Sequence, residues 1–165
     1  MKKVSIIGSA GSGKSTLAAR LGNANGITVI HLDKLYWKPG WTEPGKDEWN
    51  EIVKNILDQE EWIIDGNYGG TMEMRLAASD TIVFLDLPRT VCVWRVLKRV
   101  FRYKKGGRSD MADGCEERFD WEFLRWTWNY PRDSKPKVEN MLKRFETEKA
   151  VIRLRSRKAV NTFDL

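Results

Sequence analysis

Nine residues near the start of the chain have the types and the spacing that bind a polyphosphate. They fit the pattern G-x-x-x-x-G-K-[ST] and read Gly8, Ser9, Ala10, Gly11, Ser12, Gly13, Lys14, Ser15 and Thr16. Glycines let the backbone wrap so that its N–H groups point at phosphate oxygens, and a following helix N-terminus adds partial positive charge. We expect Lys14 to reach the β- and γ-phosphates of a nucleoside triphosphate and Ser15 to bind Mg²⁺. A glycine-rich turn that matches by chance is the alternative, and the flanking apolar strand and helix argue against it.

Two aspartates end predicted strands, on the edge of the sheet where open α/β proteins bind ligands. Asp65 closes the apolar segment 62–66, where an NTPase usually places the carboxylate that holds Mg²⁺ or its waters. Asp33 follows the segment 27–32, and a carboxylate there can orient or deprotonate an acceptor hydroxyl. For each of them the alternative is an ordinary turn or capping residue. Asp86 also ends a strand, but a proline-containing turn follows it, so it ranks below the other two.

A strongly basic stretch runs from residue 89 to residue 108, with eight basic residues and no acidic one, and we expect a helix to begin at residue 89. Within it Arg95 and Arg99 share a face at a spacing of four residues. Like charges at that spacing repel each other unless an anion lies between them. We therefore favour a role for these two arginines in stabilising a transferred phosphoryl group, over the alternative of a solvated surface.

The net charge of +6 is unevenly distributed along the chain. Residues 1–88 carry 9 basic and 12 acidic residues, whereas residues 89–165 carry 20 basic and 11 acidic ones. The basic second half therefore calls for an anionic partner, either the polyphosphate or DNA.

Cysteine usage and hydropathy bear on where the protein works. Cys92 and Cys115 fit no metal-ligand spacing and no disulfide framework, which favours a reducing cytoplasm. We expect no contact with a membrane, because no apolar run approaches the roughly 18 residues of a spanning helix. The apolar run behind Met1 is also too short for a secretory signal.

These residues are positioned by strands that alternate with helices, which predicts an α/β fold with a parallel sheet covered on both faces. We expect a single domain over 1–165. The predicted strands are 3–7, 27–32, 62–66, 81–86 and 150–154. Helices are expected at 14–21, 47–59 and 71–77 and from residue 89 onward, followed by two more that Pro131 and Pro136 separate and by a short closing helix after residue 156.

With these segments in place, the chain resembles the adenylate-kinase-related P-loop proteins over nearly its whole length. The matching parts include residues 8–16, which we call the phosphate loop, the strand end Asp65-Gly66 and the pair Arg95 and Arg99. They also include the segment Leu85-Asp86-Leu87-Pro88 and a late strand that leads to Arg155-Ser156-Arg157-Lys158. Within that group it is most similar to the bacterial DNA topology modulation proteins, through the segments 31–37, 62–68 and 126–131.

The resemblance implies a three-layer P-loop kinase fold with the strand order 2-3-1-4-5. It also implies a small acceptor-binding insert at about 33–60, a lid at about 104–118 and a final loop in which Arg155 and Lys158 bind the adenine end of ATP. Arg95 would contact the nucleotide as well.

The acceptor insert departs from adenylate kinases. Those enzymes carry an arginine shortly after the Asp-Gly pair for the acceptor's phosphate, whereas Asn67 and Tyr68 follow it here. No arginine occurs between Arg20 and Arg75. The position of Asp33 is closer to that in small kinases whose acceptor offers a hydroxyl.

Two functions remain open at this point. The first is an ATP- and Mg²⁺-dependent phosphotransferase acting on a small acceptor, possibly a nucleoside or another hydroxyl compound. In it Lys14, Asp33, Arg95 and Arg99 carry the reaction, and Ser15 and Asp65 serve the metal. The second is an ATP-binding protein that acts on or with DNA and has no small-molecule kinase activity.

Overall fold

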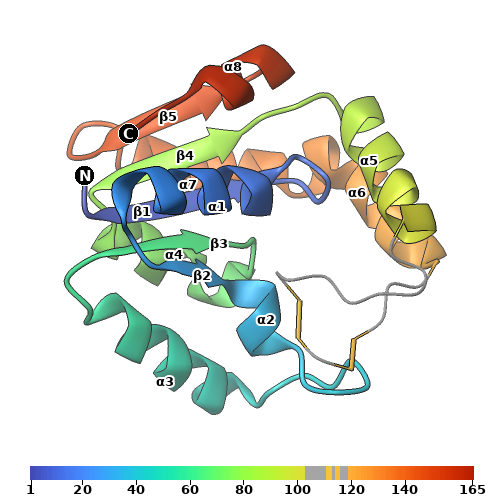
Figure 1. Cartoon of the computed structure of the whole chain (residues 1–165), viewed down its shortest axis with the longest axis horizontal. Coiled ribbons are helices and arrows are strands. Elements are labelled where there is room, and N and C mark those ends of the chain that lie inside the picture. Colours follow the sequence, from blue (N-terminus) through green and yellow to red (C-terminus); the bar gives the residue numbers. More distant parts are fainter. Residues whose placement is uncertain (103–110, 113, 116–118) are drawn as a thin grey trace.

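The computed structural model describes residues 1–102, 111–112, 114–115 and 119–165. Its centre is an all-parallel sheet of five strands in the order β2-β3-β1-β4-β5 (Figure 1). The strands are β1 (Lys3–Gly8), β2 (Val29–His31), β3 (Trp62–Asp65), β4 (Thr81–Leu85) and β5 (Ala150–Leu154). The central three are continuous buried runs of mainly aliphatic residues, as expected for a sheet covered on both faces. The α/β class, the parallel sheet and the strand order are thus confirmed.

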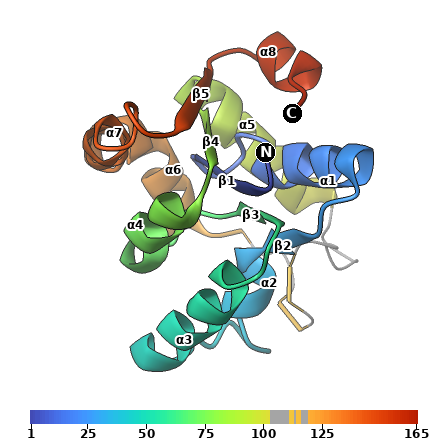
Figure 2. The ribbon, with the colours of Figure 1, turned by 90° about the vertical axis from the view of Figure 1, so that its left-hand side faces the viewer.

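Helices cover both faces of this sheet (Figure 2). On one face lie α1 (Lys14–Asn25) and α8 (Arg157–Thr162), whose buried residues join those of β1 and β4 in one core cluster. On the other face α4 (Gly69–Ala78) and α7 (Lys135–Lys143) form a second cluster. A third cluster lies at the β2 side, where α3 (Lys46–Leu57) packs against Leu32 and β3. The two remaining long helices are α5 (Arg89–Arg102) and α6 (Trp121–Asp133), which pack against each other.

The strand register determines which side chains meet at the functional edge. All five strands run parallel, so their carboxyl ends lie on the same edge of the sheet. There Asp65 of β3 lies opposite His31 of β2 on one side and opposite Ile6 of β1 on the other. The phosphate loop leaves β1 two residues beyond Ile6, so the loop and the Asp65 carboxylate are brought together by sheet pairing alone.

Several element boundaries differ from the sequence prediction. The second strand is shorter than predicted, because the chain turns at Leu32 into a short helix, α2 (Leu32–Tyr36), which carries Asp33 in its first turn. Pro131 was expected to end a helix but lies inside α6, whereas Pro136 lies in the first turn of α7, where a missing N–H costs no hydrogen bond.

The lid predicted at about 104–118 lies mostly outside the described residues. Its described members contact the predicted acceptor insert: Cys115 Sγ lies 3.3 Å from the Lys38 carbonyl, and Gly40 N–H donates to the Gly114 carbonyl at 3.3 Å. Among the helices formed by the described residues, none is long and apolar enough to cross a membrane.

Candidate active site

Three glycines shape the loop between β1 and α1. Gly8, Gly11 and Gly13 have φ values of 146°, 71° and 101°, in the region that side-chain-bearing residues rarely adopt. Space is also restricted, because a Cβ on Gly8 would lie 2.6 Å from the Leu85 carbonyl oxygen. Gly13 precedes α1 directly. Ala10 and Thr16 complete the loop, so all nine residues of the motif form a strand–loop–helix turn, as the pattern predicts.

The interior of the loop carries polar groups that suit an anion. The Lys14 amine donates to the Ser9 carbonyl at 2.9 Å, so the side chain folds back over the loop. The hydroxyl of Ser12 is buried and has no hydrogen-bond partner among the described residues. Desolvation lowers the pKa of Lys14, while the carboxylates of Asp65 and Asp33 act in the opposite direction. The lysine ammonium therefore loses hydration here, which a phosphate could replace.

Asp65 is held by two side chains at the carboxyl end of β3. The Ser15 hydroxyl donates to Asp65 Oδ2 at 2.7 Å, and His31 Nδ1 lies 2.5 Å from Asp65 Oδ1. The carboxylate is almost fully buried. The two residues that the sequence predicted for a metal, Ser15 and Asp65, are thus in direct contact, and His31 fixes the orientation of the carboxylate.

Asp33 is held by a tyrosine from the loop after β3. The Tyr68 hydroxyl donates to Asp33 Oδ1 at 2.6 Å. Burial raises the pKa of Tyr68, and the Asp33 charge raises it further, so this phenol remains a donor at neutral pH. Asp33 is also near enough to Lys14 to raise that residue's pKa, which puts the predicted acceptor-side carboxylate beside the phosphate-loop lysine.

Arg95 and Arg99 approach the loop from α5. Arg95 Nη1 donates to the carbonyls of Ser12 at 3.0 Å and of Gly11 at 3.4 Å. The Arg99 guanidinium lies 5.8 Å from the Phe123 ring centre, and its charge acts to lower the pKa of Lys14. Both arginines therefore belong to the surroundings of the phosphate loop.

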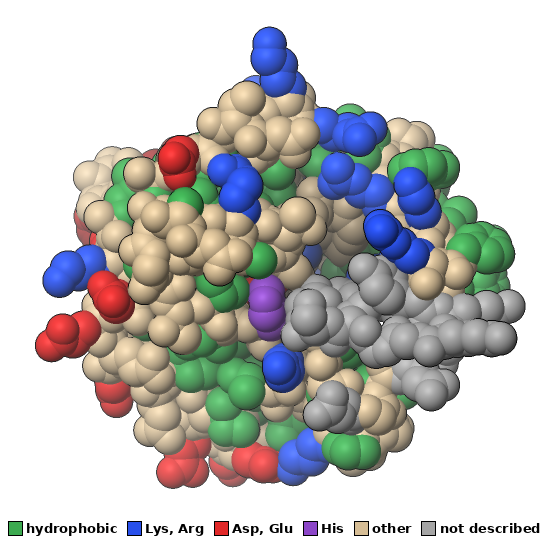
Figure 3. All heavy atoms as spheres, in the orientation of Figure 1, with side chains coloured by type: hydrophobic (Ala, Val, Ile, Leu, Met, Phe, Trp, Pro, Cys, Tyr) green, Lys and Arg blue, Asp and Glu red, His purple; other side chains and the backbone are tan. Residues whose placement is uncertain are grey.

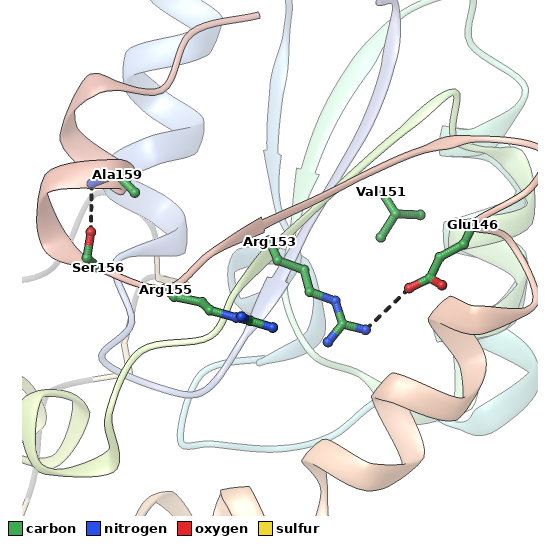
Figure 4. A pocket seen from close by; sticks show the side chains of 6 residues that line it. All are labelled: Glu146, Val151, Arg153, Arg155, Ser156 and Ala159. Atoms are coloured by element: carbon green, nitrogen blue, oxygen red, sulfur yellow. Dashed lines mark hydrogen bonds and ion pairs between the residues drawn. The ribbon is translucent and has the colours of Figure 1, made fainter.

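The two basic residues predicted for the adenine end, Arg155 and Lys158, both lie after β5 and are exposed. Arg155 lines a hollow of about 600 Å³ together with Arg153, Ser156 and Ala159 (Figure 4). It also borders a smaller hollow of about 270 Å³, which includes Ser9 of the phosphate loop, and its Nε lies 4.0 Å from Asp86. Lys158 lies in α8 and is exposed. Asp86 itself pairs with Lys135 at 2.7 Å.

Sequence reasoning missed several residues that hold the site together. Asn67 binds the backbone of Gly8 in both directions: its amide donates to the Gly8 carbonyl at 2.5 Å, and its Oδ1 accepts from the Gly8 N–H at 3.1 Å. His31 holds Asp65 and Tyr68 holds Asp33. Sequence could have pointed to His31, because it stands two residues before Asp33 at the end of a strand.

Arg75, the first arginine after Arg20, makes its hydrogen bonds to backbone carbonyls. It is fully buried and donates to the carbonyls of Gly66 at 3.2 Å and Tyr68 at 3.1 Å. Burial lowers its pKa to about 10, so it remains charged at neutral pH. Arg75 therefore supports the loop that carries Asn67 and Tyr68.

The described residues contain no group of three or more His, Cys, Asp or Glu side chains that could hold a metal ion. Magnesium bound with a nucleotide usually takes only one or two protein ligands, the remainder being phosphate oxygens and water. Ser15 and Asp65 fit that requirement, and the unpartnered Ser12 hydroxyl and the glycine turns fit a phosphate chain.

Comparison with known proteins finds similarity in sequence to a curated protein. No family model matches the chain. The uncharacterized protein YqaC of Bacillus subtilis (strain 168) is 28% identical over 131 residues, covering 78% of this chain and 72% of that protein.

Proposed function

We propose that the protein binds ATP with Mg²⁺ and transfers the terminal phosphoryl group to a hydroxyl of a small acceptor. One observation carries this proposal. The phosphate-loop lysine, Lys14, lies within electrostatic reach of Asp65, which contacts Ser15, and of Asp33, which is held by Tyr68. A metal-side carboxylate and an acceptor-side carboxylate near a phosphate-binding lysine suit phosphoryl transfer to a hydroxyl.

The roles of the binding residues follow from their contacts. The loop backbone and Lys14 would hold the triphosphate, with the lysine exchanging the Ser9 carbonyl for phosphate oxygens. Ser15, and Asp65 directly or through water, would hold Mg²⁺, which when bound neutralises charge on the phosphate oxygens. His31 keeps Asp65 oriented.

In the transfer step the acceptor oxygen attacks the γ-phosphorus, the bond between that phosphorus and the β–γ bridging oxygen breaks, and ADP leaves. Asp33 accepts the proton of the attacking hydroxyl at Oδ2, since Oδ1 already accepts the Tyr68 hydroxyl. Arg95 and Arg99 supply positive charge as negative charge spreads over the transferred oxygens. Arg95 is already hydrogen-bonded to the loop carbonyls of Gly11 and Ser12.

An uncharged acceptor suits this site better than a nucleoside monophosphate. A phosphate dianion beside ATP is usually held by arginine, whose planar fork binds two oxygens. Arg75 is buried against Gly66 and Tyr68, and Lys38 pairs with Glu48 at 2.9 Å. Half-buried aromatic rings lie around Asp33 instead, with the Tyr36 and Tyr68 centroids 4.3 Å apart. These rings, and Trp37 beside them, could stack on the ring of a nucleoside.

Calorimetry first tests the proposal that the protein binds ATP. Wild-type protein should bind ATP with Mg²⁺, and Lys14→Ala should abolish or severely weaken this binding without lowering the free energy of unfolding. Lys54→Ala, an exposed lysine of α3, is the matched control and should bind as the wild type does. Equal ATP affinity in the Lys14 variant would show that the phosphate-loop assignment is wrong.

Transfer of label from γ-labelled ATP tests which compounds serve as the acceptor. Nucleosides and other neutral hydroxyl compounds should be phosphorylated more efficiently than any nucleoside monophosphate. Efficient phosphorylation of AMP would contradict our interpretation of the acceptor region. The unpaired thiols of Cys92 and Cys115 support the cytoplasm as the place of this reaction.

A further inference from the structure

Large aromatic side chains are exposed on both α5 and α6. Trp94 and Phe101 of α5 are 57% and 74% exposed, and Trp121 and Trp128 of α6 are 70% and 42% exposed. Single exposed hydrophobic residues are ordinary, but a group of rings this large on two packed helices marks an interaction surface.

The same pattern occurs on each helix. Trp94, Lys98 and Phe101 are spaced i, i+4, i+7, and so are Trp121, Arg125 and Trp128. Residues at this spacing share one face of a helix. Each helix therefore presents a ring, a cation one turn later, and a second ring one turn beyond. We call these six residues, on one face of each helix, the aromatic–basic surface.

Cations lie against the rings of this surface. Lys98 Nζ is 5.0 Å from the Trp94 ring centre, and Arg89 Cζ is 4.2 Å from that of Trp128. The sequence of α5 contains five basic residues and no acidic one. Basic and hydrophobic side chains also lie next to each other over this part of the molecule (Figure 3, upper right).

We propose that the aromatic–basic surface binds single-stranded nucleic acid. Unpaired bases stack on aromatic rings while cations between the rings neutralise the backbone phosphates. Along one helix the two rings stand about 10.5 Å apart, since seven residues rise about 1.5 Å each. That span accommodates consecutive nucleotides with a phosphate near the central Lys98 or Arg125. This proposal concerns α5 and α6 and does not depend on phosphotransferase activity.

Other occupants fit these observations less well. The charge of α5 would repel a second copy of this face. A duplex keeps its bases stacked and so offers the rings no free base faces. A helix lying in a membrane surface separates its apolar face from its charged face. In α5 the aliphatic face, with Cys92, Val96 and Val100, is buried in the protein, and the outward face alternates rings with a cation.

Fluorescence anisotropy with a labelled oligo(dT) of about 20 nucleotides tests the proposal. This length exceeds the usual site size of a single module. Wild-type protein should bind at low salt, and the affinity should fall as salt rises. Trp94→Ala combined with Trp121→Ala should weaken binding about tenfold or more, whereas Trp94→Phe combined with Trp121→Phe should restore most of the loss. Lys98→Ala should reduce the slope of log affinity against log salt by about 0.7, whereas Lys54→Ala on α3 should leave it unchanged.

Urea unfolding of each variant shows whether the fold is intact, and we expect unchanged midpoints because these side chains are exposed. Four results would overturn the proposal: no oligonucleotide binding at low salt, binding that is insensitive to loss of both rings, tighter binding to duplex of the same length, or binding to phosphatidylserine vesicles in place of the oligonucleotide. The last result would assign the surface to a lipid bilayer.

Discussion

At the scale of single residues, Asp33 and Asp65 each accept a hydrogen bond from a hydroxyl, and both raise the pKa of the same lysine, Lys14. Tyr68 donates to Asp33, and Ser15 donates to Asp65. An ionised carboxylate accepts such charge-assisted bonds strongly, and they fix its orientation. The Tyr68 hydroxyl therefore orients Asp33, and the Ser15 hydroxyl together with His31 orients Asp65.

Replacing Asp33 should separate nucleotide binding from transfer. Asp33→Asn should lower kcat by about 10²–10⁴-fold, because the amide cannot accept the acceptor's proton. ATP affinity should be nearly unchanged. Steady-state kinetics and calorimetry measure the two quantities. Tyr68→Phe, which leaves Asp33 in place without its donor, should reduce kcat less. A kcat in Asp33→Asn equal to that of the wild type would refute the role of Asp33.

The lowered pKa of Lys14 predicts proton uptake when ATP binds. In the free protein the pKa of Lys14 lies below the ordinary value of 10.5, and bound phosphates raise it. At a pH between the free and the bound pKa, the lysine therefore takes up a proton on binding, and affinity falls as pH rises through this window. Calorimetry in buffers of different ionisation enthalpy measures the uptake. Absence of proton uptake at every pH from neutral to alkaline would contradict the prediction.

At the scale of elements, the phosphate loop is held at its start by the turn that follows β3. Asn67 makes both of its hydrogen bonds to the backbone of Gly8, and Arg75 of α4 holds the carbonyls on either side of Asn67. The loop geometry thus depends on α4 as well as on its own glycines.

Loss of the Asn67 amide should therefore weaken nucleotide binding indirectly, through the position of Gly8. Asn67→Ala removes two hydrogen bonds to Gly8, worth about 0.5–1.5 kcal/mol each, so we expect about tenfold weaker ATP binding. Asn55→Ala, an exposed asparagine on α3, should leave affinity unchanged. If both variants bind ATP as the wild type does, Asn67 does not position the loop.

At the scale of the whole molecule, one sheet brings distant segments to a single edge. Residues 31, 65 and 8 lie on three neighbouring strands, and α5 adds its arginines from the second half of the chain. Basic residues of the second half therefore lie in at least two places: near the phosphate loop, and on the exposed faces of α5 and α6.

The buried Arg75 links the site to global stability. Arg75→Met should lower the free energy of unfolding by about 1–3 kcal/mol, because the Gly66 carbonyl loses the Arg75 donor, whereas the Tyr68 carbonyl still accepts from the Thr71 N–H. Urea denaturation measures this change. Arg144→Met removes an exposed arginine paired with Glu73 and should cost less than about 1 kcal/mol. Equal effects of the two substitutions would show that the buried contacts of Arg75 add no stability.

The sequence by itself determined the phosphate loop, the α/β class and the strand-end positions of Asp33 and Asp65. These features depend on local chemistry: glycine spacing, the runs of apolar residues that make buried strands, and the residue at which each run ends. The strand order came from resemblance to a family, and the strand pairing confirms it.

Only the tertiary structure decided which side chains hold the carboxylates and where the arginines point. The partners of Asp65, Asp33 and Gly8 are 34, 35 and 59 residues away in the chain, for His31, Tyr68 and Asn67 respectively. No local pattern encodes such pairs, because sheet register and helix docking create them. Arg75 illustrates the same point: its type and position were compatible with binding an acceptor, but packing of α4 against the sheet buried it under the loop.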